Sequence, residues 1–186
     1  MNQRLTPLIL GLLFTLFLSQ GTRAQDALTA GYFSNVGIQP GAQLGLVFDL
    51  KEVSERNRVL FLSPQIASFT RPGVNTNYLL RVEGGIRQNS QSGKSFSALS
   101  GSLGYLLRSE LLSLSVNLGS GDIEDKTRES SHHFVPTIHY TYGRYLNEKW
   151  SWLSKAGLGY RFETDDQGSA MVFIEAGIYL KLIGNN

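Results

Sequence analysis

The sequence ends on "EAGIYLKLIGNN" (Glu175–Asn186), in which apolar residues alternate with polar ones. In a β-strand, successive side chains point to opposite faces, so this run separates into two sets. One set is apolar and consists of Ala176, Ile178, Leu180 and Leu182; the other consists of Glu175, Gly177, Tyr179 and Lys181. A helix would mix the two sets. The stretch therefore predicts a strand with an apolar environment on one side and a polar environment on the other.

The first residues have the features of an export signal. Met1–Arg4 carries positive charge, Leu8–Leu18 is an apolar run, and Thr22 and Ala24 are small residues at the positions that a signal peptidase reads. The run is shorter than the roughly 20 apolar residues that a spanning helix needs. We expect residues 1–24 to be a cleaved signal peptide and residues 25–186 to form one domain.

The composition of the chain excludes several classes of function. Removal of Arg4 and Arg23 with the signal leaves equal numbers of basic and acidic residues, so no basic surface for nucleic acid is expected. The chain contains no Cys, which excludes disulfides and thiolate metal sites.

Period-two alternation recurs in eight segments of about ten residues, which is typical of a membrane β-barrel. The eight predicted strands are Gln43–Leu50, Arg58–Arg71, Asn77–Gln88, Ser95–Leu107, Leu111–Gly119, Phe134–Leu146, Trp150–Glu163 and Ala170–Leu182. No segment after Ala24 could form a spanning helix. The predicted fold is an eight-stranded antiparallel up-and-down transmembrane β-barrel, because only helices and closed barrels can pair every backbone group in lipid.

The connections are predicted to alternate in length, with tight turns at Arg108–Glu110 and Asn147–Lys149 and a long polar loop at Gly119–His133. This alternation matches the periplasmic and outer sides of such a barrel. Outward aromatic residues form two predicted girdles. Tyr78, Tyr105, Tyr142, Trp150 and Trp152 are placed near the short turns, and Phe48, Phe134, Tyr160 and Phe162 near the long loops. Leu114 and Val116 are placed at mid-depth in the lipid-facing wall.

Charged residues fall on the inner face. A barrel of eight strands is just wide enough for side chains to fill it. We expect a structural ion-pair network in the lumen, in which Glu175 has Lys155, Arg161 and Arg81 as its nearest cationic candidates. Its predicted members are Arg81, Glu83, Arg87, Lys155, Arg161, Glu163, Glu175 and Lys181. The alternative is that these residues line a gated ion path.

Over its whole length after the signal, the chain resembles the small eight-stranded outer-membrane barrels of Gram-negative bacteria, the OmpA/OmpX-like class. "EAGIYLKL" also resembles the C-terminal signal that the barrel assembly machinery reads, carried here by Glu175, Gly177, Leu180 and Leu182. The familiar signal ends on an aromatic residue, whereas "IGNN" follows here. The resemblance implies a monomer in outer-membrane lipid, assembled by that machinery, with a structural or surface-interaction role for its outer loops.

The sequence around the three histidines favours neither a metal site nor a catalytic site. His132 and His133 are adjacent, so on a strand they point to opposite faces and chelate a metal poorly. "IHYTY" around His139 and Thr141 faintly resembles the His-x-Ser stretch of PagL-type lipid A deacylases. Here Thr replaces Ser, Tyr142 stands where Asn is expected, and His139 is predicted to face inward. We therefore expect no enzyme, no metal and no cofactor.

Three alternatives remain open at this point. One is a narrow, porin-like pore, the second is a lipid A-modifying barrel enzyme, and the third is a secreted lipocalin-type binding barrel. The third would place apolar residues inside and charged residues outside. No residue pattern names a loop partner.

Overall fold

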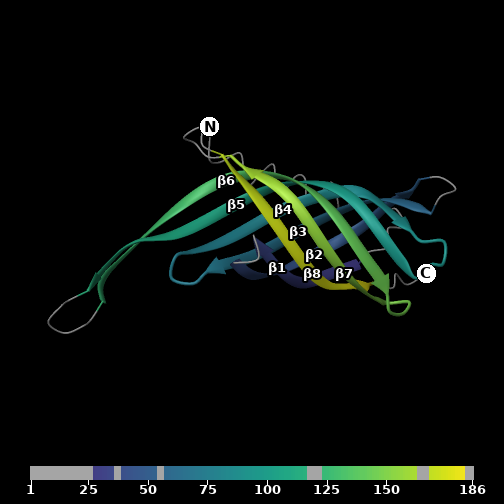
Figure 1. Cartoon of the computed structure of the whole chain (residues 1–186), viewed down its shortest axis with the longest axis horizontal. Coiled ribbons are helices and arrows are strands. Elements are labelled where there is room, and N and C mark those ends of the chain that lie inside the picture. Colours follow the sequence, from purple (N-terminus) through teal and green to yellow (C-terminus); the bar gives the residue numbers. More distant parts are fainter. Residues whose placement is uncertain (1–26, 36–38, 54–56, 117–122, 163–167, 183–186) are drawn as a thin grey trace.

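The computed structural model describes residues 27–35, 39–53, 57–116, 123–162 and 168–182, and within 111–128 it describes the backbone alone. The described chain forms eight strands (Figure 1). They are β1 (Ala27–Asn35), β2 (Gln39–Glu52), β3 (Arg58–Arg71), β4 (Asn75–Asn89), β5 (Ser95–Val116), β6 (Ile123–Tyr145), β7 (Trp150–Arg161) and β8 (Ser169–Lys181). In this part of the chain, no helix is long and apolar enough to cross a membrane.

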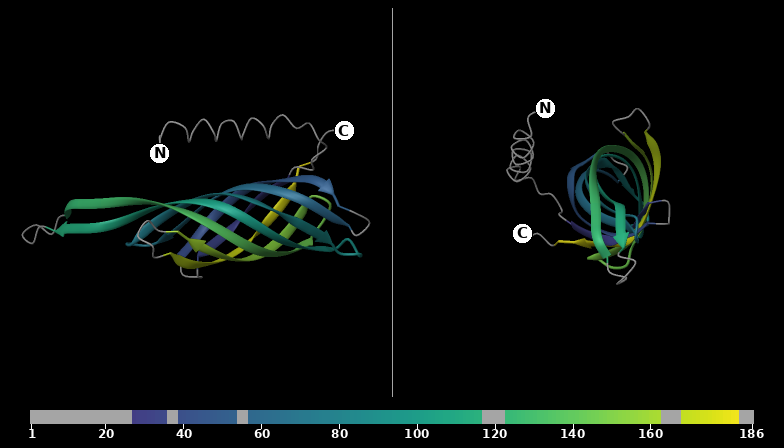
Figure 2. Two further views of the ribbon diagram at one scale, coloured as in Figure 1. Left: turned by 90° about the horizontal axis from the view of Figure 1, so that it is seen from above. Right: turned by 90° about the vertical axis from the view of Figure 1, so that its left-hand side faces the viewer.

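Each strand pairs antiparallel with its neighbours in chain order, and β1 pairs with β8 to close a barrel (Figure 2). The closing seam runs from Ala27 opposite Lys181 to Asn35 opposite Phe173. We call the end at which β1 begins and β8 ends the terminal end. The opposite end, toward which β5 and β6 extend, is called the hairpin end.

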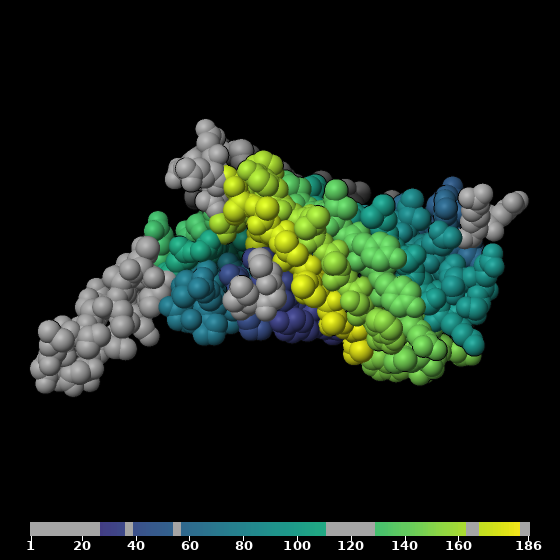
Figure 3. All heavy atoms as spheres, viewed as in Figure 1, coloured from purple at the N-terminus to yellow at the C-terminus, as the bar shows by residue number. Residues whose placement is uncertain are grey.

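The alternation in the sequence divides the wall as predicted. Ile138 and Leu158 are 67% and 69% exposed on the outer face, whereas His139, which follows Ile138 on β6, is fully buried. Figure 3 shows one side of this wall, covered by side chains of β6, β7 and β8. An apolar outside and a charged inside are the reverse of a soluble lipocalin-type barrel, so that alternative was wrong.

Two predicted strands were wrong, although the number eight was right. β1 was missed because "ALTAGYFSN" is short and rich in small residues, so its alternation is weak. Ser95–Leu107 and Leu111–Gly119 are one strand, β5, as far as Val116. The predicted turn at Arg108–Glu110 is paired on both sides, with Asn75–Asn77 of β4 and Glu129–Ser131 of β6. Arg108–Glu110 was predicted as a turn because it is polar, but a strand is also polar where it continues out of the lipid.

The predicted long loop Gly119–His133 was also wrong, because β6 begins at Ile123. β5 and β6 have 22 and 23 residues, whereas the other strands have 9 to 15. The asymmetry between the two ends therefore lies in strand length and not in alternating loop length. Leu114 pairs with Lys126 in the projecting hairpin, so its predicted place at mid-depth was wrong as well.

Because β5 is a single strand, some aromatic residues of the predicted girdles lie at the other end of the barrel. Tyr105 pairs with Phe134, so it lies toward the hairpin end, and Tyr78 opposite Leu107 lies there too. Phe48 lies on the part of β2 nearer the terminal end. Tyr142 and Trp152 lie toward the terminal end as predicted, with ring centroids 5.7 Å apart.

Candidate functional site

Four charged side chains meet inside the barrel, about halfway between its ends. Arg81 Nη2 donates to Glu175 Oε1 at 2.6 Å, and Lys155 Nζ lies 3.3 Å from Glu175 Oε2. Lys155 Nζ also donates to Glu83 Oε2 at 2.7 Å. All four side chains are at most 7% exposed, and their formal charges cancel. We call these four residues the central cluster.

Uncharged polar side chains complete the hydrogen bonding of the central cluster. Gln43 Nε2 donates to Glu175 at 2.8 Å, and Gln65 links the cluster by accepting from Arg81 and donating to Glu83. Ser100 donates to the other oxygen of Glu83 at 2.6 Å. A buried carboxylate is tolerated when cations and donors surround it, which is the arrangement here.

His139 lies beside this cluster and is fully buried. Its Nε2 is 3.0 Å from Ser102 Oγ on β5. Its ring also lies over Gly157 of β7, where an added Cβ would be 2.4 Å from His139 Nδ1. His139 and Thr141 therefore both face the interior and not the lipid.

On the hairpin side of the central cluster, the next layer of the interior is an apolar cluster. The rings of Phe33 and Phe69 have centroids 5.2 Å apart, and those of Phe33 and Phe173 are 5.4 Å apart. The remaining members of this cluster are Ala67, Leu79, Leu106, Val135 and Met171. The Arg81 guanidinium lies 5.4 Å from the centroid of the Phe33 ring, so the charged and apolar layers are in direct contact.

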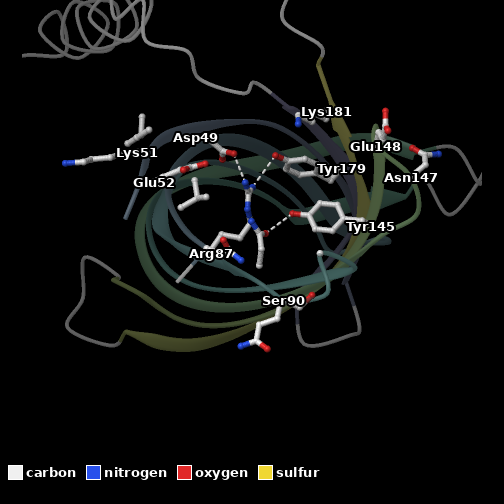
Figure 4. Close-up of a pocket in the computed structure, with 16 residues that line it drawn as sticks. Asp49, Lys51, Glu52, Arg87, Ser90, Tyr145, Asn147, Glu148, Tyr179 and Lys181 are labelled. Atoms are coloured by element: carbon white, nitrogen blue, oxygen red, sulfur yellow. Dashed lines mark hydrogen bonds and ion pairs between the residues drawn. The ribbon is translucent and has the colours of Figure 1, made fainter. Parts of the chain in front are cut away.

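On the terminal side, the interior opens into a polar vestibule of about 1000 Å³ (Figure 4). At its floor, Arg87 Nη2 lies 2.5 Å from Asp49 Oδ2, and Arg87 Nη1 donates to the Tyr179 hydroxyl at 3.2 Å. Tyr145 donates to Asn89 at 2.9 Å. The Arg87 guanidinium also lies over the ring of Phe96, 5.9 Å from its centroid.

The structure brings four of the eight residues of the predicted network together, namely Arg81, Glu83, Lys155 and Glu175. Arg87 pairs separately with Asp49 in the vestibule, and Lys181 lines the same vestibule. Arg161 lies at the hairpin end of β7, opposite Ser169, and not beside Glu175. Glu163 lies outside the described residues.

Several residues of the interior were not among the predicted site residues. Gln43 and Asp49 face the interior of the barrel and alternate with outward leucines of β2, so the pattern of this strand could have identified them. Phe33 was missed together with its strand. Phe69 and Phe61 break the polar pattern of β3 because they face inward, a signal that the alternation alone could have given.

The proposed assembly-signal residues lie at the closing seam. Gly177 is opposite Gly31, where a Cβ on either residue would lie within 2.5 Å of backbone atoms. Leu182 is exposed on the outer side, and Glu175 belongs to the central cluster. Whether the assembly machinery reads them stays a prediction.

The other two histidines make local contacts at the hairpin end. His132 Nδ1 is 2.5 Å from the Tyr105 hydroxyl, and His133 Nε2 is 2.9 Å from Ser131 Oγ. Among the residues that the structure describes, no three His, Asp or Glu side chains are placed to hold a metal ion.

Neither protein-family models nor curated proteins match this chain. Solved structures do. A major outer membrane protein from Thermus thermophilus is similar with a TM-score of 0.63 and 12% identity, over 87% of this chain and 100% of that one. Neisserial surface protein A is similar with a TM-score of 0.50 and 10% identity, over 86% and 96%. A de novo designed transmembrane β-barrel is similar with a TM-score of 0.52 and 13% identity, over 85% and 95%.

These likenesses and the closed, eight-stranded topology define the class of fold. The chain has the transmembrane barrel fold of the small outer-membrane proteins, the OmpA/OmpX-like class. At such low identity the comparisons carry the fold and not the role of any one relative.

Proposed function

We infer that this protein is exported to the outer membrane, where it is a non-enzymatic, non-conducting barrel that contacts a partner through the β5–β6 hairpin. The observation that carries this proposal is the extension of that hairpin beyond the wall (Figure 1). The last pair between β4 and β5 is Asn75–Glu110, and the regular β6–β7 ladder starts at Thr137.

Beyond those pairs, Leu111–Val116 and Ile123–Arg128 pair with each other and with no other described strand. Each strand of the hairpin thus has one open edge with backbone donors and acceptors. Open edges are natural places for an extended segment of another protein to add as a further strand. Both termini of the barrel lie at the other end, which in an exported barrel is the periplasmic end, so the hairpin faces the outside.

Two further observations support the remaining parts of the proposal. The apolar cluster and the balanced central cluster occupy successive levels of the interior, which favours a closed barrel over a narrow pore. The burial of His139 away from lipid favours a role without catalysis on lipid A.

The test is a barrel with a shortened hairpin. Residues 111–128 are replaced by Asn-Gly, because Glu110 and Glu129 are already cross-strand neighbours and a two-residue turn can join them. The shortened protein should still resist unfolding in an unheated gel, as the wall is unchanged. Cells that display it should lose the adhesion to immobilised proteins that cells with the full hairpin show. Equal adhesion by both cell lines would refute the role of the hairpin.

A further inference from the structure

Two glycines lie directly opposite each other on the outer face of the barrel wall. Gly84 of β4 pairs with Gly101 of β5, and both belong to the lipid-facing alternation of their strands. Their row continues to Leu62 on one side and to Ile138 and Leu158 on the other. The wall therefore lacks two neighbouring side chains in the middle of an otherwise apolar row.

Packing inside the protein does not require these two glycines. A Cβ on Gly84 would meet nothing nearer than 3.8 Å, and one on Gly101 nothing nearer than 3.9 Å. At every other described strand glycine, a Cβ would lie within 3.0 Å of a neighbouring atom. Glycine weakens a strand, so its presence without an internal reason indicates a site at which another molecule approaches the backbone.

The missing side chains leave a shallow hollow of about 660 Å³ across β3 to β7. Its walls are formed by Leu62, Val82, Leu103, Ile138, Leu158 and Tyr160. None of the described residues that line it is charged. Its size lies within the range of about 300–1,000 Å³ that is usual for small-molecule sites.

The chemistry of the hollow fits one kind of occupant. It is continuous with the lipid-facing wall, and its lining offers apolar contact and no ionic anchor. Tyr160 stands at the edge nearer the hairpin end, where the aromatic girdle meets the polar region of a bilayer. A second copy fits less well, because a two-fold contact would set hollow against hollow and lose dispersion contacts.

We propose that this hollow is a binding site for one acyl chain of a membrane phospholipid, which lies across the Gly84–Gly101 pair. Binding depends on the chain and not on the headgroup, since no charged side chain lines the hollow. Elsewhere on the described wall, the small outward residues, such as Ala176, still carry a Cβ that keeps lipid away from the backbone.

The experiment is native mass spectrometry of the full exported protein in detergent, titrated with palmitoyl-oleoyl phosphatidylethanolamine. The wild type should retain one lipid. In Gly84→Val with Gly101→Val, the ratio of lipid-bound to lipid-free protein should fall about tenfold, which corresponds to about 1.4 kcal/mol. Both substitutions should permit folding, because the added Cβ atoms meet open space.

Ala176→Val is the matched control. Ala176 is an exposed small residue of β8, between Tyr32 and Ser154 on another part of the wall. It should leave lipid retention unchanged, and phosphatidylglycerol with the same chains should bind as well as phosphatidylethanolamine. Three results would overturn the proposal: equal retention by the valine pair and the wild type, dependence on the headgroup, or a wild-type dimer that the valine pair abolishes.

Discussion

At the scale of single residues, Glu175 has the most demanding position in the chain. It is fully buried and receives contacts from Arg81, Lys155 and Gln43. Its charge matters more than its volume, because the two cations around it share only one other buried carboxylate, Glu83, among the described residues. Removal of that charge leaves a positive excess where water cannot screen it.

We therefore expect Glu175→Gln to lower the free energy of unfolding by about 3–5 kcal/mol, the cost of breaking a buried pair. The measurement is urea unfolding of the folded barrel in detergent, followed by the gel shift between unheated and boiled samples. The double variant Arg81→Met with Glu175→Met keeps Lys155 and Glu83 balanced, so it should recover most of the loss. A double variant less stable than the single one would contradict the ion-pair explanation.

The ring of His139 lies over Gly157 and leaves no room for a side chain there. A Cβ there would lie 2.4 Å from His139 Nδ1, and the ring is fully buried, so it has little room to move aside. Gly157→Ala should therefore destabilise the barrel by about 1–3 kcal/mol, the usual cost of overpacking. Gly84→Ala is the matched control and should cost nothing, since its nearest atom is at 3.8 Å. The same unfolding assay compares them, and equal losses would show that glycine as such, and not the ring, sets the cost.

At the scale of strands, the sequence predicts the strands whose two faces differ clearly in polarity and misses those whose faces do not. The bounds of β3 match the prediction at both ends, and β4, β7 and β8 match within two residues. β1 was not predicted, because its small residues give little contrast in hydrophobicity between the two faces of the strand. β5 was divided because Arg108–Glu110 is polar, and polarity marks departure from the membrane as well as a turn.

The side chains of the interior are also predicted only as far as alternation allows. Alternation identifies which charged residues face inward, but not the height at which each one lies, because height depends on register and strand stagger. Arg161 and Arg87 were thus grouped with Glu175 although register places them at other levels. The apolar cluster around Phe33 could not be predicted as a unit, because alternation can mark a residue such as Phe69 as inward but does not show which residues of other strands it meets.

Depth along a strand gives a third prediction. Ile138 lies midway between the girdle residues Phe134 and Tyr142 on β6 and is 67% exposed. Arginine at the midplane of a barrel wall costs about 2–4 kcal/mol, so Ile138→Arg should reduce the folded fraction in lipid vesicles. Leu146→Arg is the control, because Leu146 is 63% exposed but follows β6 at the terminal end, where water is near. Equal losses at both positions would show that the membrane lies at a different height.

At the scale of the whole molecule, the proposed closed interior predicts electrical silence. Wild-type protein in a planar bilayer should show almost no current. Glu175→Gln should also be silent, because the apolar cluster of Phe33, Phe69 and Phe173 lies between the central cluster and the hairpin end. Current should appear only when Glu175→Gln is combined with alanine at all three phenylalanines and also at Phe61 and Phe96, which belong to a second buried apolar cluster on the terminal side.

The same alanine variant without Glu175→Gln controls for loss of aromatic packing alone. Large, steady, ohmic channels from the wild type would promote the narrow pore over the closed barrel.

The seam between β1 and β8 determines when the protein can enter a membrane. It joins the first and last described strands, so the residues that meet there, such as Ala27 and Lys181, are almost as far apart in sequence as the described chain allows. Contacts between such distant residues form slowly. Until they form, the edges of β1 and β8 hold unpaired backbone groups, each of which costs several kcal/mol in hydrocarbon. Insertion and closure must therefore happen together, and we expect a chain interrupted before β8 to be degraded and not to form a smaller barrel.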